Sequence, residues 1–288
     1  MLGQDERVRR AAAAALLLLL PLAGCSGGDT SGDGSTNDAA ASSPSTTPSA
    51  SATPTTATAA PKPRDRACYR LDYAAAVAPT TTAKPQDCGG AHTAMTYAVG
   101  TLDTVVAGHL VAVDSAKVQQ QVATECPQRL PAFLGGSPEA LRLSMLRAVW
   151  FTPTVEESDA GADWYRCDVI AVAAEGRLAP LTGALRGVLA RPDAAARYGM
   201  CGTAEPGTSG FDRVICSGSH SWRAIDTVTF SGSAYPGVAK ARDAGQGPCE
   251  DAARARASDA LNFKWSYEWP TAAQWRGGQT YGLCWIPD

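Results

Sequence analysis

The stretch Cys88–His92, CGGAH, returns later in the chain as Cys216–His220, CSGSH. In both stretches histidine follows cysteine by four positions, although the 288 residues include only three histidines. The surrounding cysteines repeat as well, in two sets of four with separations of 20, 38 and 41 residues and then 15, 33 and 35. These sets are Cys68, Cys88, Cys126 and Cys167, followed by Cys201, Cys216, Cys249 and Cys284. Landmarks that recur in one order at scaled spacing indicate an internal repeat.

A second set of landmarks follows the same register. Pro153–Thr154 lies fourteen residues before Cys167, and Pro270–Thr271 lies fourteen residues before Cys284. A glycine stands at matching positions between them, Gly161 in the first half and Gly278 in the second. Three independent registers therefore agree on the repeat.

This order of features resembles the septum formation domain of actinobacterial envelope proteins. The resemblance extends from Cys68 to Trp285 and implies two tandem copies. The second copy, with Trp269 and Trp275, is closer to the W-P-T-x-x-x-W-x-x-G pattern of that family. The first copy reads Phe151–Thr154, FTPT, and then Ser158 at the matching places.

The expected fold class is α+β, with two small disulfide-stapled domains at residues 65–190 and 191–288. Each would combine a short mixed or antiparallel sheet with one main helix, because helical spacing over 114–135 stands among short β-branched and aromatic runs. The chain has nine cysteines, and eight remain when Cys25 is set aside as the expected lipidation site. An even number of cysteines in an exported chain indicates a disulfide framework. Four cysteines permit three pairings per copy, and sequential pairing is preferred since it joins neighbouring elements. Pro127 and Pro131 are expected to kink or end the helix early.

The N-terminus has the pattern of an export signal over residues 1–24. Three arginines precede an apolar run, Ala11–Leu20, which is too short to span a bilayer permanently. Leu22–Cys25, LAGC, resembles the lipobox of bacterial lipoproteins, which makes Cys25 the expected site of lipidation with chains such as palmitate. The alternative is an ordinary signal peptide with an unrelated cysteine. Residues 25–64 would then be a tether, because their Ser, Thr, Ala and Pro content cannot bury enough apolar surface to fold.

Composition restricts the partners. The formal net charge is −3, whereas nucleic-acid-binding proteins show basic patches. No nucleic-acid partner is expected, and the membrane would be contacted through the N-terminal lipid alone. The expected location is the outer face of the cell membrane.

The sequence contains no recognisable catalytic constellation. Hydrolase signatures and phosphate-binding glycine loops are absent from it. His92 and His220 have no carboxylate at the same position in both copies, and oxidised cysteines cannot supply the thiolates of a zinc site. We expect no enzyme activity, no metal and no cofactor.

Two groups of side chains remain as candidate binding residues. His92 and His220 would either satisfy backbone groups of their own turns or contact a partner from exposed turns. Trp265, Tyr267 and Trp269 alternate along the chain, so on a strand they would share one face that packs a core or presents a platform. Trp275 is included because it belongs to the family pattern.

The sequence therefore predicts a lipid-anchored envelope protein that serves as a non-catalytic binding or scaffold module. The family resemblance implies a connection with septum formation or wall assembly, and an envelope protein or cell-wall glycan as the partner. The alternative is an enzyme or transport accessory that handles wall precursors or small exported molecules in a pocket between the two domains.

Overall fold

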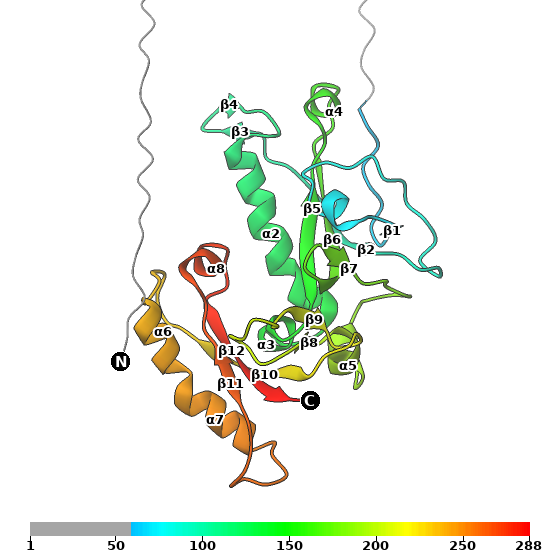
Figure 1. Ribbon diagram of the computed structural model, residues 1–288. Coiled ribbons are helices and arrows are strands. Elements are labelled where there is room, and N and C mark those ends of the chain that lie inside the picture. The colour runs from blue at the N-terminus through cyan, green and yellow to red at the C-terminus, as the bar shows by residue number, and fades with distance from the viewer. Residues whose placement is uncertain (1–58) are drawn as a thin grey trace, which may run out of the picture. The chain divides into compact units, whose positions relative to one another are not determined.

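The first half of the described chain builds a five-stranded sheet (Figure 1). The computed structural model describes residues 59–288, so the predicted signal peptide, Cys25 and most of the tether lie outside the described residues. The strands follow one another in space as β1 (Cys68–Tyr69), β2 (Ala94–Thr101), β6 (Trp164–Ala174) and β5 (Leu146–Phe151), with β7 (Arg177–Leu178) beside β6. A separate hairpin joins β3 (Val105–Val106) to β4 (His109–Leu110).

The second half builds another five-stranded antiparallel sheet. Its strands lie in the order β11 (Ser266–Glu268), β12 (Tyr281–Pro287), β10 (Trp222–Thr229), β8 (Met200–Gly202) and β9 (Arg213–Ile215). The coarse expectation of an α+β fold with antiparallel sheets is confirmed.

The two sheets agree in detail. If the second is read from β8, its order β8-β10-β12-β11 corresponds to β1-β2-β6-β5 of the first. The β2–β6 register shifts between Thr96 and Ala98, and the β10–β12 register shifts between Ala224 and Asp226. Each shift begins eight residues after the second cysteine of its set. The repeated sequence landmarks therefore have repeated positions in the sheets.

Short helices surround the sheets and one long helix, α2, packs on the first (Figure 1). The helices are α1 (Tyr73–Ala76), α2 (Ala116–Leu134), α3 (Pro138–Arg142), α4 (Val155–Asp159), a 3₁₀ turn (Val188–Ala190), α5 (Ala194–Tyr198), α6 (Val238–Ala244), α7 (Gln246–Arg254) and α8 (Ala272–Arg276). Helices α4 and α8 stand at equivalent places and both begin with a threonine capping box, at Thr154 and Thr271.

The helix expected over residues 114–135 is present as α2, but of the two effects expected of its prolines, an early end is wrong. The helix continues through Pro127 and Pro131 to Leu134, and Gly135 caps it in the left-handed conformation. Each proline removes one helical hydrogen bond. That loss is offset because the buried face of α2, including Val122 and Leu130, packs in the core and Cys126 is covalently linked to β6.

The predicted sequential disulfide pairing is confirmed in both halves. The bonds are Cys68–Cys88, Cys126–Cys167, Cys201–Cys216 and Cys249–Cys284. In each half the second bond connects a helix to the long central strand, α2 to β6 and α7 to β12. Helix position relative to the sheet is therefore fixed covalently.

One hydrophobic cluster connects the two halves. It contains Leu130 and Leu146 from the first half together with Leu283 and Trp285 from the second. Backbone hydrogen bonds from Met145 to Tyr198 (2.7 Å) and from Met200 to Leu143 (2.8 Å) cross between the halves as well. The connecting segment contributes the buried residues Leu181, Leu185 and Val188 to this cluster.

Candidate functional site

The two recurring histidines were the first candidates, and both are tied to their own turns. The His92 Nδ1 lies 3.0 Å from the carbonyl oxygen of Gly90, and the His220 Nδ1 lies 2.7 Å from that of Gly218. The same ring nitrogen therefore contacts the carbonyl two residues earlier in both halves. The structure supports the turn-stabilising interpretation for this shared contact.

His92 is not at the surface. Only 1% of the residue is exposed, and its backbone exchanges two hydrogen bonds with Leu181, at 3.2 and 2.7 Å. The expectation of an exposed turn is wrong here because the segment that connects the halves pairs with the turn. A buried imidazole of this kind cannot contact a partner directly.

His220 is half-buried and has a second contact. Its Nε2 lies 2.5 Å from the Oδ2 of Asp288, whose carboxylate also accepts hydrogen bonds from Arg223 at 2.7 and 2.8 Å. The hydrogen bonds from Arg223 and then His220 lower the pKa of Asp288 to about 2, against the opposing effect of burial. Both ring nitrogens of His220 have partners within the protein, so neither is available to take a proton from a substrate.

The aromatic residues of the second half form packing contacts. Tyr267 is buried on the disulfide Cys249–Cys284, and Trp265 and Trp269 pack partly against the same cluster. Their shared face is therefore directed at α7, which favours the core interpretation. Trp275 in α8 is also buried, and its Nε1 donates to the carbonyl oxygen of Ser233 at 3.0 Å.

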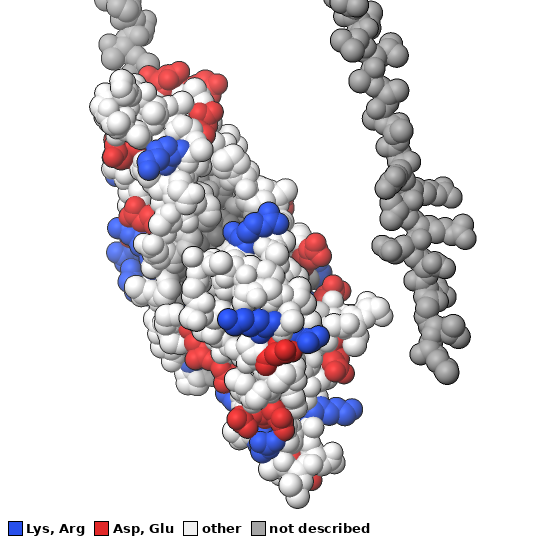
Figure 2. All heavy atoms as spheres, turned by 90° about the vertical axis from the view of Figure 1, so that its left-hand side faces the viewer, with Lys and Arg blue, Asp and Glu red and all other residues white. Residues whose placement is uncertain are grey.

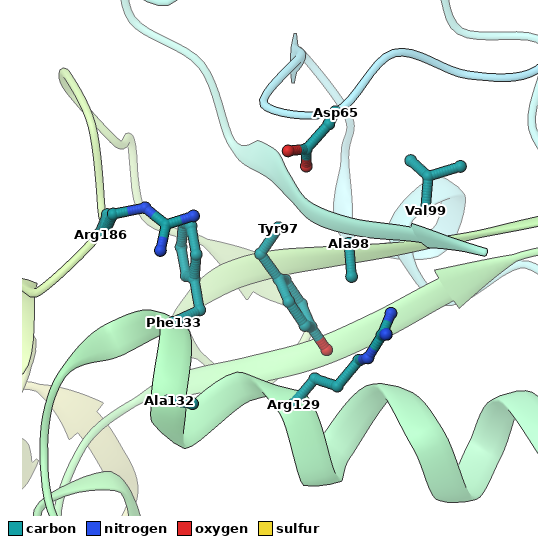
Figure 3. Close-up of a pocket in the computed structure, with 8 residues that line it drawn as sticks. All are labelled: Asp65, Tyr97, Ala98, Val99, Arg129, Ala132, Phe133 and Arg186. Carbon is teal, nitrogen blue, oxygen red and sulfur yellow. The ribbon is translucent and has the colours of Figure 1, made fainter.

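A cavity of about 460 Å³ lies between β2 and the C-terminal part of α2 (Figure 3). Its two arginines already have partners: Arg129 is 3.4 Å from Glu125, and the Arg186 guanidinium lies 5.1 Å from the ring centre of Phe133. Figure 3 also shows Asp65 above the cavity, so an acid offsets the positive charge. We use this cavity below as a reference.

A second cavity of about 710 Å³, here called the central cleft, lies between the two halves. It is bounded by α2, α3 and β5 on one side and by β9, α8 and the start of β12 on the other. Apolar wall residues are Ala123, Pro127, Leu130, Leu141, Leu146 and Ala148. Three arginines also line the cleft: Arg142, Arg147 and Arg213. A cavity of this size and composition is typical of a small-molecule site.

The three arginines differ in the partners of their positively charged groups. Arg213 donates to both carboxylate oxygens of Glu268, at 3.2 and 2.7 Å, and to Gln279 at 3.1 Å. Arg142 donates to the Thr229 hydroxyl at 2.9 Å, and its guanidinium lies 4.8 Å from the ring centre of Tyr281. Arg213 is therefore a paired cation, and Arg142 is a half-exposed one.

Arg147 lies on the edge strand β5 and has no ion pair among the residues the structure describes. Its Nη1 donates to the carbonyl oxygens of Ser144 and Leu146, at 2.8 and 2.7 Å. Burial lowers the pKa of Arg147, and the charge of Arg213 acts in the same direction against the effect of Tyr281. The cleft therefore holds a partly buried cation without an acidic partner.

The face drawn in Figure 2 carries no large patch of one sign of charge. Figure 2 shows positive and negative side chains interspersed over a mostly uncharged face. Within residues 59–288, no three His, Cys, Asp or Glu side chains come together in a way that could hold a metal ion. None of the helices in this part of the chain is long and apolar enough to cross a membrane.

Residues 147–284 match the family model described as septum formation. The match supports the septum formation family. It begins at Arg147, within β5, and ends at Cys284, so it contains the second half and the end of the first. A role in septum or wall assembly and an envelope location are compatible with this match and with the four disulfides. No curated protein and no solved structure matches the chain.

Sequence reasoning placed a pocket between the two halves only in its alternative hypothesis, and none of its candidate binding residues lines the central cleft. The family pattern pointed near the cleft, since Gln274 and Gly278 lie within the W-P-T-x-x-x-W-x-x-G stretch and line the cavity. One further signal was present, a single arginine within the apolar run Leu146–Phe151. This arginine indicates a binding site only if the edge strand that carries it faces the second half. That arrangement is set by tertiary packing.

Proposed function

We propose that this chain is a lipid-anchored, exported protein of the cell envelope that acts as a non-catalytic binding module in septum formation or wall assembly. Cys25 would carry the lipid and the residues up to 64 would form the tether. The central cleft would hold the ligand or a segment of the partner. The family match and the disulfide-rich fold support the envelope role.

The single observation that carries the binding interpretation is the lining of the central cleft. Among the described residues that line it there is no carboxylate, histidine, cysteine, serine, threonine or lysine side chain, and Tyr281 is the one lining residue there of a type used in general acid–base catalysis. The Tyr281 ring lies 4.8 Å from the guanidinium of Arg142, and the described lining offers it no second acid–base group and no nucleophile. Arginine, glutamine and apolar side chains can bind and orient a molecule, which favours recognition over reaction.

The tandem arrangement belongs to this proposal. The matching strand order, register shifts, disulfides and capping boxes support two copies of one domain. In this proposal the copies form a single binding unit, because the central cleft takes side chains from both. An envelope protein or a cell-wall glycan remains the proposed class of partner.

One observation favours a second candidate, a transport accessory for small exported molecules or wall precursors. Such a protein requires a pocket between the copies with at least two convergent polar groups. The central cleft meets that requirement with Arg142, Arg147 and Arg213.

The proposal is tested by blocking the cleft. Ala123→Trp places a large side chain in the central cleft, whereas Ala132→Trp on the same helix α2 fills the reference cavity instead. The full-length chain and both variants are used to capture partners from envelope extract and to sediment with purified cell wall. Loss of capture in Ala123→Trp alone supports the proposal. Equal capture by all three would place binding elsewhere and overturn it.

A further inference from the structure

The free donors of Arg147 point to a specific ligand chemistry. Arginine carries five N–H donors. Only Nη1 of Arg147 has hydrogen-bond partners in the part of the chain that the structure describes, the carbonyls of Ser144 and Leu146. The Nε–H and the Nη2 donors therefore have no protein acceptor there, although the side chain borders the central cleft.

The two backbone bonds hold this guanidinium in place before any ligand arrives. Because Nη1 is fixed at both carbonyls, the Nε and Nη2 edge keeps one orientation. That edge is the one with which arginine grips carboxylate or phosphate through two parallel hydrogen bonds. A preformed edge loses little side-chain entropy when a ligand binds.

Charges around Arg147 leave a net positive cleft. Arg213 lies on the opposite wall and is neutralised by Glu268, whereas Arg142 donates to a hydroxyl and lies over an aromatic ring. The carboxyl group of Glu139 is near Arg142 but forms no ion pair with it among the described residues; a hydrogen bond with Asp226 raises the pKa of Glu139, and Arg142 opposes this change. Glu175 and Asp212 line an adjoining cavity that also contains Arg147, but neither is within ion-pair distance of it among the described residues. Three arginines and no carboxylate thus line the described cleft, and Glu268 is the ion-pair partner of one of these arginines.

The central cleft also has apolar walls, which restrict the kind of ligand that fits it. Leu130 and Leu141 line the cleft on the side of α2 and α3, opposite the polar Gln274 and Gln279. An inorganic ion alone would leave these walls unfilled. We propose that the central cleft binds a phosphate monoester carried on a compact apolar body, with Arg147 as its central ligand and Arg142 as a second donor.

Phosphate fits this cleft better than carboxylate. A phosphate monoester has three acceptor oxygens and a charge of about −1.5 to −2 at neutral pH. That charge matches the excess of two arginines over the single Glu268, whereas a carboxylate would leave one arginine unmet. The inference rests on the proposed function, since it names the ligand class of the same cleft.

Phenyl phosphate is the probe, titrated into the full-length chain with all four disulfides formed and followed by isothermal calorimetry. We expect saturable binding. Arg147→Gln should weaken it at least tenfold, because a hydrogen bond between charged groups is lost (about 10-fold to 150-fold). Arg186→Gln is the matched control: it removes one positive charge from the reference cavity and should leave the affinity unchanged.

A gain of affinity provides a second and independent test. Glu268→Gln removes the carboxylate that occupies Arg213 while keeping a side chain of the same shape. Phenyl phosphate should then bind about threefold to tenfold more tightly. This is the change expected when an ion pair worth about 1 kcal/mol no longer competes for Arg213. If Arg147→Gln fails to fold, Arg142→Gln at the cleft wall should still weaken binding.

Further arms distinguish the source of the phosphate. Inorganic phosphate should compete weakly, benzyl alcohol should not compete, and vesicles of phosphatidic acid compete only if a lipid headgroup can enter. Absence of saturable binding up to 10 mM phenyl phosphate, or equal affinity of wild type and Arg147→Gln, would overturn the inference. In that case loss of partner capture by Ala123→Trp would still support the proposed function, so the two failures can be told apart.

Discussion

The two sheets share strand order, register shifts and disulfide positions, yet the centres of their long strands differ in chemistry. Around the helix-linked cysteine, β6 carries Arg166 and Asp168, whereas β12 carries Leu283 and Trp285 at the same places. All four residues are buried. One strand position thus holds either an ion pair or apolar side chains without a change in the order of strands.

The ion pair of the first sheet, Arg166 with Asp168, is buried. The Arg166 Nη2 lies 3.0 Å from the Asp168 Oδ2, and Thr96 donates to the other carboxylate oxygen at 2.7 Å. The Arg166 guanidinium also lies 3.8 Å from the ring centre of Tyr69 and 4.5 Å from that of Phe151. Aromatic rings therefore cover the charge on the face opposite α2.

The apolar side chains at the same places in the second sheet lie in the core between the halves. Leu283 and Trp285 belong to the cluster that includes Leu146, and the Trp285 ring meets Phe211 edge to face at 5.3 Å. Ala224 replaces Thr96 at the matching register position. The difference teaches that burial against the other half selects apolar side chains, whereas a face covered by its own loops and strands tolerates an ion pair.

The largest expected effect comes from reduction of all four disulfides. Each closes a loop of 15 to 41 residues, and should contribute about 3 to 4 kcal/mol. Their sum is comparable to the whole free energy of unfolding of a typical protein. Reduction should therefore unfold both sheets, measured as loss of the far-ultraviolet circular dichroism of the folded chain.

The paired variants Cys126→Ser/Cys167→Ser and Cys249→Ser/Cys284→Ser sharpen this comparison. Each should lose about 4 kcal/mol and still unfold in one transition, because the two sheets share a cluster. Two separate thermal transitions in either variant would show that the halves fold independently.

The next largest effect concerns the ion pair. Arg166→Leu copies Leu283 into the first sheet and leaves Asp168 buried without its partner, which should cost about 3 to 5 kcal/mol at pH 7. The double variant Arg166→Leu/Asp168→Leu should recover most of that loss, since an apolar pair replaces the ions. Urea unfolding of the three proteins measures both steps. A single and a double variant of equal stability would mean that the pair itself does not matter.

The pH dependence of the free energy of unfolding reports on the carboxyl group of Asp168. Burial raises the pKa of Asp168 to about 6, although Arg166 and Thr96 oppose the change. The folded state therefore keeps a proton that the unfolded state, with a pKa of about 3.9, has already released. This contribution is fully present below about pH 4 and is lost as the pH rises to about 6.

Urea unfolding at pH 4, 5, 6 and 7 should show this decline in wild type as a difference from the double variant Arg166→Leu/Asp168→Leu. In Arg166→Leu the decline should extend to higher pH, because the guanidinium that lowers the pKa of Asp168 is gone. Parallel pH profiles for wild type and the double variant would contradict the assignment to Asp168.

The sequence predicted most of what is local and repeated. The cysteine pattern predicted a disulfide framework, and the preference for bridges between neighbouring elements selected the pairing that the structure has. Runs of β-branched and aromatic residues predicted strands, because a strand depends on short-range pattern. The course of α2 through Pro127 and Pro131 was missed, since its stability comes from burial and from the bond to Cys167. The residues that line the central cleft were missed for a related reason: Arg147 and Arg213 are 66 positions apart and meet only through packing of the two halves.

The smallest effect separates the two histidine turns. His92→Ala removes a buried ring and the bond to Gly90, so it should cost about 2 kcal/mol. His220→Ala should cost about 1 kcal/mol, because 15% of its side chain is exposed and Asp288 keeps both hydrogen bonds from Arg223 when the ring is removed. The His220 variant should also raise the pKa of Asp288, which two-dimensional NMR of the carboxyl carbon would detect. Equal losses in both variants would mean that the shared bond to the turn, present in each half, decides the cost, and that the Leu181 segment covering His92 adds nothing.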